Sequence, residues 1–154
     1  MENLNNFIIE FGGFIPLLSI FFLFLQAIIQ LNCLYLFMIC VIIFDYTLIG
    51  PKLKQISHFL KIDSPRPAYP QLNGMPSGHT QVMWLCFIFF TLQKDHFNSI
   101  LFGILAIITS YQRVASKMHS LKQVNVGLIF GVILGFFWNY FYNLELKTNI
   151  PLFI

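Results

Sequence analysis

The stretch FIIEFGGFIPLLSIFFLFLQAIIQL, residues 7–31, holds a single charged side chain and is long enough to cross a lipid bilayer as a helix. A membrane-spanning helix needs about 20 mostly apolar residues. Four further apolar stretches follow, at 33–50, 80–92, 100–115 and 124–142, of which 80–92 is short. The sequence therefore predicts an all-α, multi-spanning helical bundle with about five spans.

The composition of the chain agrees with this prediction. Of the 154 residues, 57% are hydrophobic and 10% are charged, whereas soluble domains are roughly 45–50% apolar and 25% charged. A soluble chain of this size could not hide its nineteen phenylalanines from water. We expect a single integral-membrane domain over residues 1–154.

The net charge is +3, and a basic chain raises the question of nucleic acid. Here the basic residues lie in short segments between apolar stretches rather than on an exposed soluble face. We therefore expect the bilayer and an anionic membrane lipid as partners, and no nucleic acid.

Most ionisable side chains fall into two polar segments, 51–79 and 112–123. The first lies between spans two and three and the second between spans four and five, so both emerge on one face of the membrane. The alternative explanation of this asymmetry is the positive-inside rule, which needs no functional site.

The first polar segment has two parts. Pro51 suits the first position of a helix, and the apolar residues that follow predict a short helix along the membrane interface. Residues 65–76 contain four prolines and Gly74, which favour turns and extended chain. Such a loop is a suitable frame for a pocket.

The motif Pro76-Ser77-Gly78-His79 stands where this loop gives way to the third span. The first N–H groups of a helix have no partner inside the helix. Ser77, Gly78 and His79 can therefore direct backbone donors, supported by the helix dipole, at a phosphate oxygen. The plain alternative is a serine N-cap followed by an incidental histidine.

A second motif joins spans four and five. Arg113 is followed six residues later by His119 and four further on by Gln123. If the fifth helix begins near Met118, His119 and Gln123 lie one turn apart on the same face, and Gln123 could orient the imidazole.

Arg66 lies between two prolines that restrict the backbone. Arginine matches phosphate oxygens with two hydrogen bonds and stays charged. The alternative for Arg66 and Arg113 is a cation that snorkels to the interface.

Two histidines and two arginines on one face favour phosphoryl transfer. Asp63 is the single acidic residue in the two segments, and Mg²⁺ sites are normally built on carboxylates; we expect neither metal nor cofactor.

These segments resemble the signature of the type-2 phosphatidate phosphatase superfamily: a Lys upstream of Arg-Pro, then Pro-Ser-Gly-His, then Arg-x5-His-x3-Asp. Residues 74–84 and 110–114, with His119, Gln123, Val124 and Gly127, are similar to the dolichyl diphosphatase branch, which has Gln in place of the Asp. The resemblance implies a helical core like that of acid phosphatases and vanadium haloperoxidases.

The resemblance also implies roles. His119 would be the nucleophile and His79 the acid that protonates the leaving oxygen. The phosphate would be held by Arg66, Arg113, Ser77 and the Gly78 N–H, and Gln123 would accept a hydrogen bond from His119. The implied activity is hydrolysis of a polyprenyl diphosphate to the monophosphate. The alternatives are another lipid phosphate such as phosphatidate, or a protein that keeps the fold without activity.

One position departs from the family pattern. The family's Lys usually precedes Arg-Pro by seven residues, and Phe59 stands there. Lys61 is the preferred substitute and Lys54 the alternative.

The resemblance implies a lumenal site in the endoplasmic reticulum, although positive-inside reasoning would place the basic segments in the cytosol.

Two further features lie inside the spans. Gly127, Gly131 and Gly135 recur every four residues, a spacing that allows close helix contact; packing within the bundle is the default, and a homodimer through this face is the alternative. Asp45 is costly in lipid and is expected to face the bundle.

Overall fold

The computed structural model describes residues 12–70, 72 and 74–148. The elements in chain order are a 3₁₀ turn η1 (Gly12–Phe14), α2 (Ile15–Gln30), α3 (Cys33–Phe44), a π-helical turn η2 (Asp45–Ile49), α4 (Gly50–Phe59), α5 (Gly78–Leu92), α6 (His96–Ala115) and α7 (Leu121–Thr148). Within these residues no β-strand is formed. The all-α prediction is confirmed.

Among the described residues, four helical stretches are long and apolar enough to cross a membrane: Gly12–Gln30, Cys33–Phe59, His96–Ala115 and Leu121–Leu144. The part of the first predicted span before residue 12 lies outside the described residues. The short predicted span at 80–92 is α5, which has 15 residues. At 1.5 Å per residue it is roughly 22 Å long, less than the bilayer core of about 30 Å.

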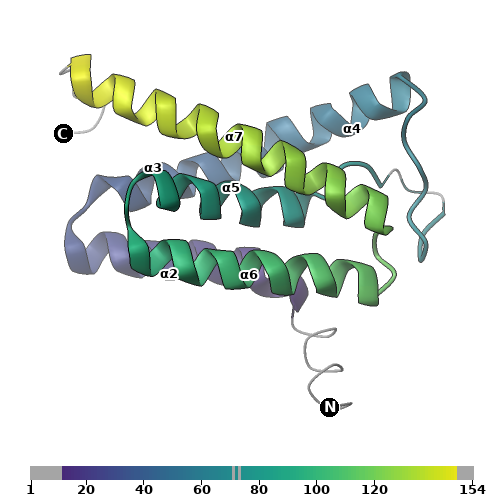
Figure 1. Ribbon diagram of the computed structural model, residues 1–154, viewed down its shortest axis with the longest axis horizontal. Coiled ribbons are helices and arrows are strands. Elements are labelled where there is room, and N and C mark those ends of the chain that lie inside the picture. Colours follow the sequence, from purple (N-terminus) through teal and green to yellow (C-terminus); the bar gives the residue numbers. More distant parts are fainter. Residues whose placement is uncertain (1–11, 71, 73, 149–154) are drawn as a thin grey trace, which may run out of the picture.

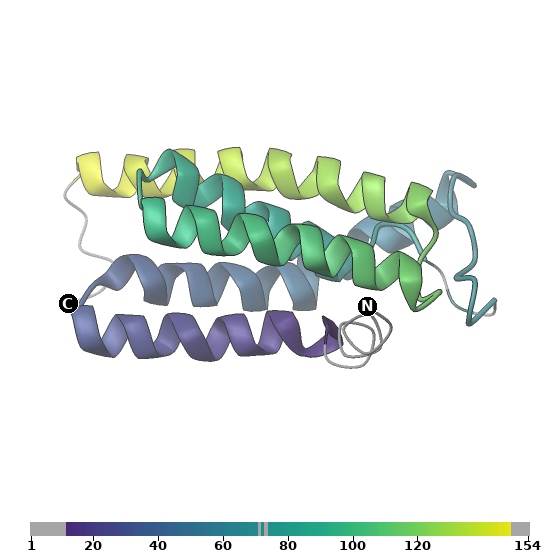
Figure 2. The same cartoon turned by 60° about the horizontal axis from the view of Figure 1, so that its bottom comes forward.

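Helix α5 can be short because it is the central helix of the bundle. It packs mainly against α7 and α6 and also touches α2 (Figures 1 and 2). Leu85, Cys86, Phe89 and Phe90 on this helix are fully buried. Most of its surface therefore meets protein rather than lipid, and it positions its own first turn against the neighbouring helices.

The glycine face of α7 packs against α5. A Cβ on Gly127 would lie 2.6 Å from the carbonyl oxygen of Ser77, and one on Gly135 would lie 2.7 Å from the Cβ of Ile88. Gly131 comes equally close to the backbone of Gln81. The close contact is thus made within the chain, and a dimer through this face would require that contact to open.

The short helix predicted at Pro51 is present as α4, with Pro51 in its first turn, but it is not separate from the second span. Gly50 has helical dihedral angles, and the chain runs without interruption from α3 through η2 into α4. Proline removes a backbone N–H and crowds the carbonyl four residues earlier. The π-helical turn directly before Pro51 widens the backbone there, so the helix continues as one element of 27 residues.

The two polar segments lie at the same end of the bundle, as the crossing count predicts. The loops that follow α4 and α6 meet at one end, and the α2–α3 and α5–α6 turns lie at the other (Figure 1). The backbone N–H of Ala68 donates to the carbonyl oxygen of Lys117 at 2.9 Å. This bond ties the first loop to the second.

Candidate active site

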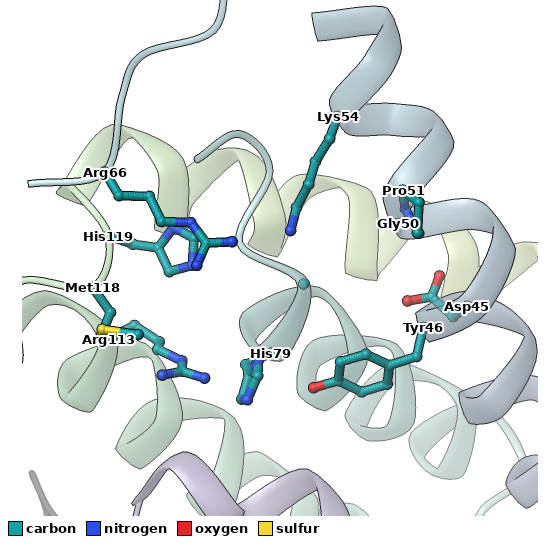
Figure 3. A pocket seen from close by; sticks show the side chains of 11 residues that line it. Asp45, Tyr46, Gly50, Pro51, Lys54, Arg66, His79, Arg113, Met118 and His119 are labelled. Carbon is teal, nitrogen blue, oxygen red and sulfur yellow. The ribbon is translucent and has the colours of Figure 1, made fainter. Parts of the chain in front are cut away.

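A cavity of about 140 Å³ opens at the end of the bundle where the two loops meet. One buried water needs roughly 10–15 Å³ of such space, so the cavity admits a group several times larger. Its lining comes from η2, α4, α5, α6 and both loops (Figure 3): Asp45, Tyr46, Gly50, Pro51, Lys54, Arg66, Gly78, His79, Arg113, Met118 and His119.

His119 is carried by the turn that follows α6. Its backbone N–H donates to the carbonyl oxygen of Arg113 at 3.0 Å, so the chain between the two residues is closed into a compact ring. The helix α7 begins at Leu121, later than the predicted start near Met118. His119 therefore precedes the helix, and its ring is 5% exposed.

The side chain of Gln123 orients this imidazole, in the way the spacing predicts. Its Oε1 lies 3.0 Å from His119 Nδ1 and accepts a hydrogen bond from the Ser120 N–H at 3.1 Å. Ser120 Oγ in turn accepts from the Gln123 N–H at 3.3 Å. This reciprocal pair is the capping box of an α-helix N-terminus.

The amide of Gln123 can adopt one orientation in this network. Its Nε2 donates to the carbonyl oxygens of Ser64 (2.6 Å) and Pro65 (3.1 Å), which can only accept. The oxygen must then face His119, so Nδ1 of the imidazole carries the proton. Nε2 of His119 is left with a free lone pair.

The same amide anchors the loop that carries Arg66. Gly74 lies so close to the Gln123 amide that a Cβ would overlap it. Asp63 Oδ1 accepts from the backbone N–H groups of Ser64 (2.7 Å) and Met75 (2.9 Å), which draws the two ends of the loop together. The Arg66 side chain extends from this frame toward His119 (Figure 3).

Arg113 is on the last turn of α6 and is 7% exposed. Its Nε has no hydrogen-bond partner among the residues that the structure describes. A buried guanidinium nitrogen without a partner is costly, and its head group faces the cavity beside His79 (Figure 3). An anion bound there would supply the missing acceptor.

His79 lies in the first turn of α5 across the cavity from His119 (Figure 3). Its ring meets the Tyr46 ring edge to face, with centroids 5.6 Å apart at 84°. It also forms a hydrogen bond with the backbone of Gly13. Both predicted histidines therefore line one cavity.

Of the predicted phosphate donors at the start of α5, Gly78 lines the cavity and Ser77 does not. Helix α5 begins at Gly78 with Ser77 as its N-cap. Gly78 lines the cavity, and nothing lies within 4 Å of where its Cβ would be. Ser77 is fully buried outside the lining, its hydroxyl 3.1 Å from the Thr80 hydroxyl and its N–H bonded to Gln123 O.

The two candidate lysines differ in their position relative to the cavity. Lys54, the alternative, lines the cavity and extends into it from α4 (Figure 3). Lys61, the preferred residue, is exposed and has a left-handed backbone with φ 56° just after α4 ends. The turn at Lys61 directs the chain out of the helix, whereas Lys54 still lies on the helix over the cavity.

The charge of the site affects His119. Burial, and next the positive charges of Arg66, Arg113 and Lys54, lower the pKa of His119 to about 4, while the bond to Gln123 opposes the shift. At neutral pH the imidazole is therefore uncharged, which is the form a nucleophile requires.

Several lining residues were not found by sequence reasoning. Asp45 was expected only to face the bundle, and it does so: it is 1% exposed and accepts hydrogen bonds from Gln81 Nε2 at 2.8 and 2.9 Å. The Tyr46 hydroxyl is buried and has no hydrogen-bond partner within the described chain. Polar side chains inside the second span were the signal that could have pointed to this wall.

In the described part of the chain, no group of three His, Cys, Asp or Glu side chains gathers in a way that could hold a metal ion. The carboxylate nearest the cavity, Asp45, is engaged by Gln81. The side chains available to balance a bound anion are thus arginine and lysine.

The fold and the cavity together define a class: a multi-spanning helical membrane protein with a cationic, histidine-lined cavity at one end of its bundle. Residues 26–147 match the model of the PAP2 superfamily, which is the type-2 phosphatidate phosphatase superfamily. The chain belongs to this superfamily.

A search of curated proteins found Dolichyldiphosphatase 1 of Dictyostelium discoideum, 32% identical over 80 residues. The match covers 44% of this chain and 35% of that protein, so the chain spans about a third of the length of the curated relative. No solved structure matches the chain.

Proposed function

We propose that this protein is a metal-independent lipid phosphatase that hydrolyses a polyprenyl diphosphate to the monophosphate and inorganic phosphate through a phosphohistidine intermediate. The observation that carries the proposal is the orientation of the His119 imidazole. Its Nδ1–H donates to Gln123 Oε1, which leaves the lone pair of Nε2 available in a cationic cavity. The likeness to a dolichyldiphosphatase supports the choice of lipid.

In the first step, Nε2 of His119 attacks the terminal phosphorus and a nitrogen–phosphorus bond forms. The bond from that phosphorus to the bridging oxygen breaks, and His79 gives its proton to this oxygen as the polyprenyl monophosphate leaves. In the second step, water attacks the phosphohistidine while His79 takes a proton from it. Inorganic phosphate leaves and both histidines return to their starting states.

The cations of the cavity supply the charge balance for both steps. Arg66, Arg113 and Lys54 line the space where the phosphoryl oxygens would lie, and Gly78 allows close approach of the backbone. Preorganised cations of this kind stabilise charge that develops in a transition state. Gln123 orients the nucleophile as a neutral amide and so stabilises an imidazolium less than a carboxylate would.

A protein that keeps the fold without activity was the competing hypothesis, motivated by the missing family Lys and Asp. Lys54 lies in the cavity and can take the place of the family Lys. Gln123 accepts the hydrogen bond of His119 in place of the family Asp. These contacts favour the enzyme.

The test measures phosphate release from a polyprenyl diphosphate in excess chelator by the purified wild type and by His119→Ala. His96→Ala, at the opposite end of the bundle at the start of α6, is the matched control. We expect release by the wild type and the control and none above background by His119→Ala. Equal release by all three proteins would refute the mechanism, and a parallel assay with phosphatidate decides between the two lipid classes.

We further propose that the cavity opens to the lumen of the endoplasmic reticulum, as the resemblance to the dolichyl diphosphatase branch suggests. A glycosylation acceptor inserted in the loop between α4 and α5 tests this. Glycan addition is expected, and labelling of the same loop from the cytosol would contradict it.

A further inference from the structure

One apolar groove adjoins the cavity and a second adjoins the first, so the lining residues form a continuous series. The nearer groove, of about 330 Å³, is lined by Gly13, Pro16, Leu17, Ile20, Ile43, Tyr46, Thr47 and His79. It shares His79 and Tyr46 with the cavity. The second groove, of about 500 Å³, shares Leu17 and Ile20 with the first and adds Leu18, Phe21, Phe24 and Ile39.

The position of His79 gives this path a direction. His119 lines only the cavity, whereas His79 lines both the cavity and the nearer groove. In an in-line displacement the nucleophile and the leaving group lie on opposite sides of phosphorus. The leaving group, which carries the lipid, must then depart on the side of His79, where the apolar groove begins.

We propose that the hydrocarbon chain of the lipid substrate leaves the cavity alongside His79 and Tyr46, whose rings are in contact, and lies in the apolar groove along α2. This inference rests on the proposed function, because it takes the cavity as the phosphate site. It adds a substrate-binding surface made of α2 and of the segment from α3 through η2, which meets the sequence motifs only at His79.

The geometry of α2 suits a long chain. Leu17, Phe21 and Phe24 lie at spacings of four and three residues and so share one face of the helix. From Gly13 to Phe24 the groove follows roughly 16 Å of helix, about half the hydrocarbon thickness of a bilayer. Leu17 and Phe21 are more than half exposed, so the described chain leaves most of their surface open.

The groove acts through orientation rather than hydrophobic gain, because lipid tails are as apolar as its walls. A chain held there would fix the diphosphate between the two histidines. Filling the groove should therefore lower kcat/KM for long-chain substrates more than for a substrate without a tail.

Two variants fill the groove. Gly13→Phe adds a side chain where nothing lies within 4 Å of the Cβ position, and Leu17→Trp enlarges an exposed side chain shared by both grooves. The matched control is Ile104→Trp on α6, which is 52% exposed and lines neither groove. Each protein is assayed on a long polyprenyl diphosphate and on methyl diphosphate, which has the same scissile bond.

We expect both groove variants to lower the ratio of the two kcat/KM values about tenfold or more, the size of effect that follows from misplacing a substrate, and Ile104→Trp to leave it unchanged. An unchanged ratio in both groove variants would overturn the proposal. If the wild type hydrolyses neither substrate, the proposed function fails, and binding alone then decides the groove.

That binding measurement uses a polyprenyl diphosphate with a photoreactive diazirine on its chain, applied to the full protein in lipid nanodiscs. We expect labelled peptides from α2 around residues 17–24, protected by unlabelled polyprenyl diphosphate. Labelling that is spread equally over the α6 surface around Ile104, or that resists competition, would overturn the proposal.

Discussion

The backbone N–H of Ser77 donates a hydrogen bond of 3.1 Å to the carbonyl oxygen of Gln123. This bond joins the start of α5 to the first turn of α7, and Gly127 allows the approach because a larger residue would meet the Ser77 carbonyl. The register between the two helices is thereby fixed at the site itself. His79 and His119, which follow Ser77 and precede Gln123, are brought to one cavity as a result.

The stability of the protein should depend on pH through His119. The pKa is about 4 in the folded state and about 6.5 when unfolded. Between about pH 4 and 6.5, His119 is protonated in the unfolded chain but neutral in the folded protein. Stability therefore falls as pH drops from 6.5 toward 4 and is unaffected above about 7. We expect the melting temperature in detergent to follow this course in the wild type and to be flatter in His119→Gln. Identical curves would contradict the assignment.

His79→Asn should slow hydrolysis of a polyprenyl diphosphate by roughly 10²- to 10⁴-fold, the usual contribution of a general acid. Asparagine fills similar space but cannot give a proton to the leaving oxygen. The defect should shrink with p-nitrophenyl phosphate, whose leaving group needs no proton. A variant slowed equally on both substrates would indicate that His79 acts only in binding.

Lys54→Met should raise KM for the diphosphate by roughly 10- to 100-fold, the loss of one hydrogen bond to a charged group. Lys61→Met is the matched control, because Lys61 is exposed and lies outside the cavity. Initial rates over a range of substrate concentrations distinguish the two. The assignment is wrong if Lys61→Met has the larger effect.

Gln123→Glu should destabilise the protein by roughly 1–3 kcal/mol, although it restores the carboxyl group typical of the superfamily. The amide donates to the carbonyls of Ser64 and Pro65, and a carboxylate would face these oxygens with no proton to share. Gln55→Glu is the control, because Gln55 is exposed on α4 and a carboxylate there stays hydrated. Thermal unfolding measures both, and a Gln123→Glu variant as stable as the wild type contradicts the network.

Gly74→Ala should lower both stability and kcat. The new methyl group would overlap the Gln123 amide, and overpacking of this kind typically costs about 1–3 kcal/mol. The displaced amide would then lose its hold on His119. Gly13→Ala, where the Cβ meets nothing within 4 Å, is the control for stability. Full retention of the wild-type melting temperature in Gly74→Ala would count against the contact.

Much of the architecture follows from patterns that are local in sequence. Apolar runs determine spans because lipid offers no partner for backbone polar groups, and the positions of α2, α6 and α7 follow these runs closely. Counting crossings was enough to place both polar loops at one end. The short helix at Pro51 was predicted correctly, but its continuity with the second span was not, because a π-helical turn accommodates proline within a continuous helix and hydropathy does not report that turn.

The sequence by itself determined the helical membrane fold and the short-range pairing of His119 with Gln123, because both depend on spacing along one chain segment. Only the tertiary structure decided that Lys54 rather than Lys61 lines the cavity, that Ser77 is buried in the α5–α7 contact, and that Tyr46 forms a wall beside His79. These outcomes depend on how helices distant in sequence pack against one another. Such packing is set by the shapes of many side chains together, and no single stretch of sequence records it.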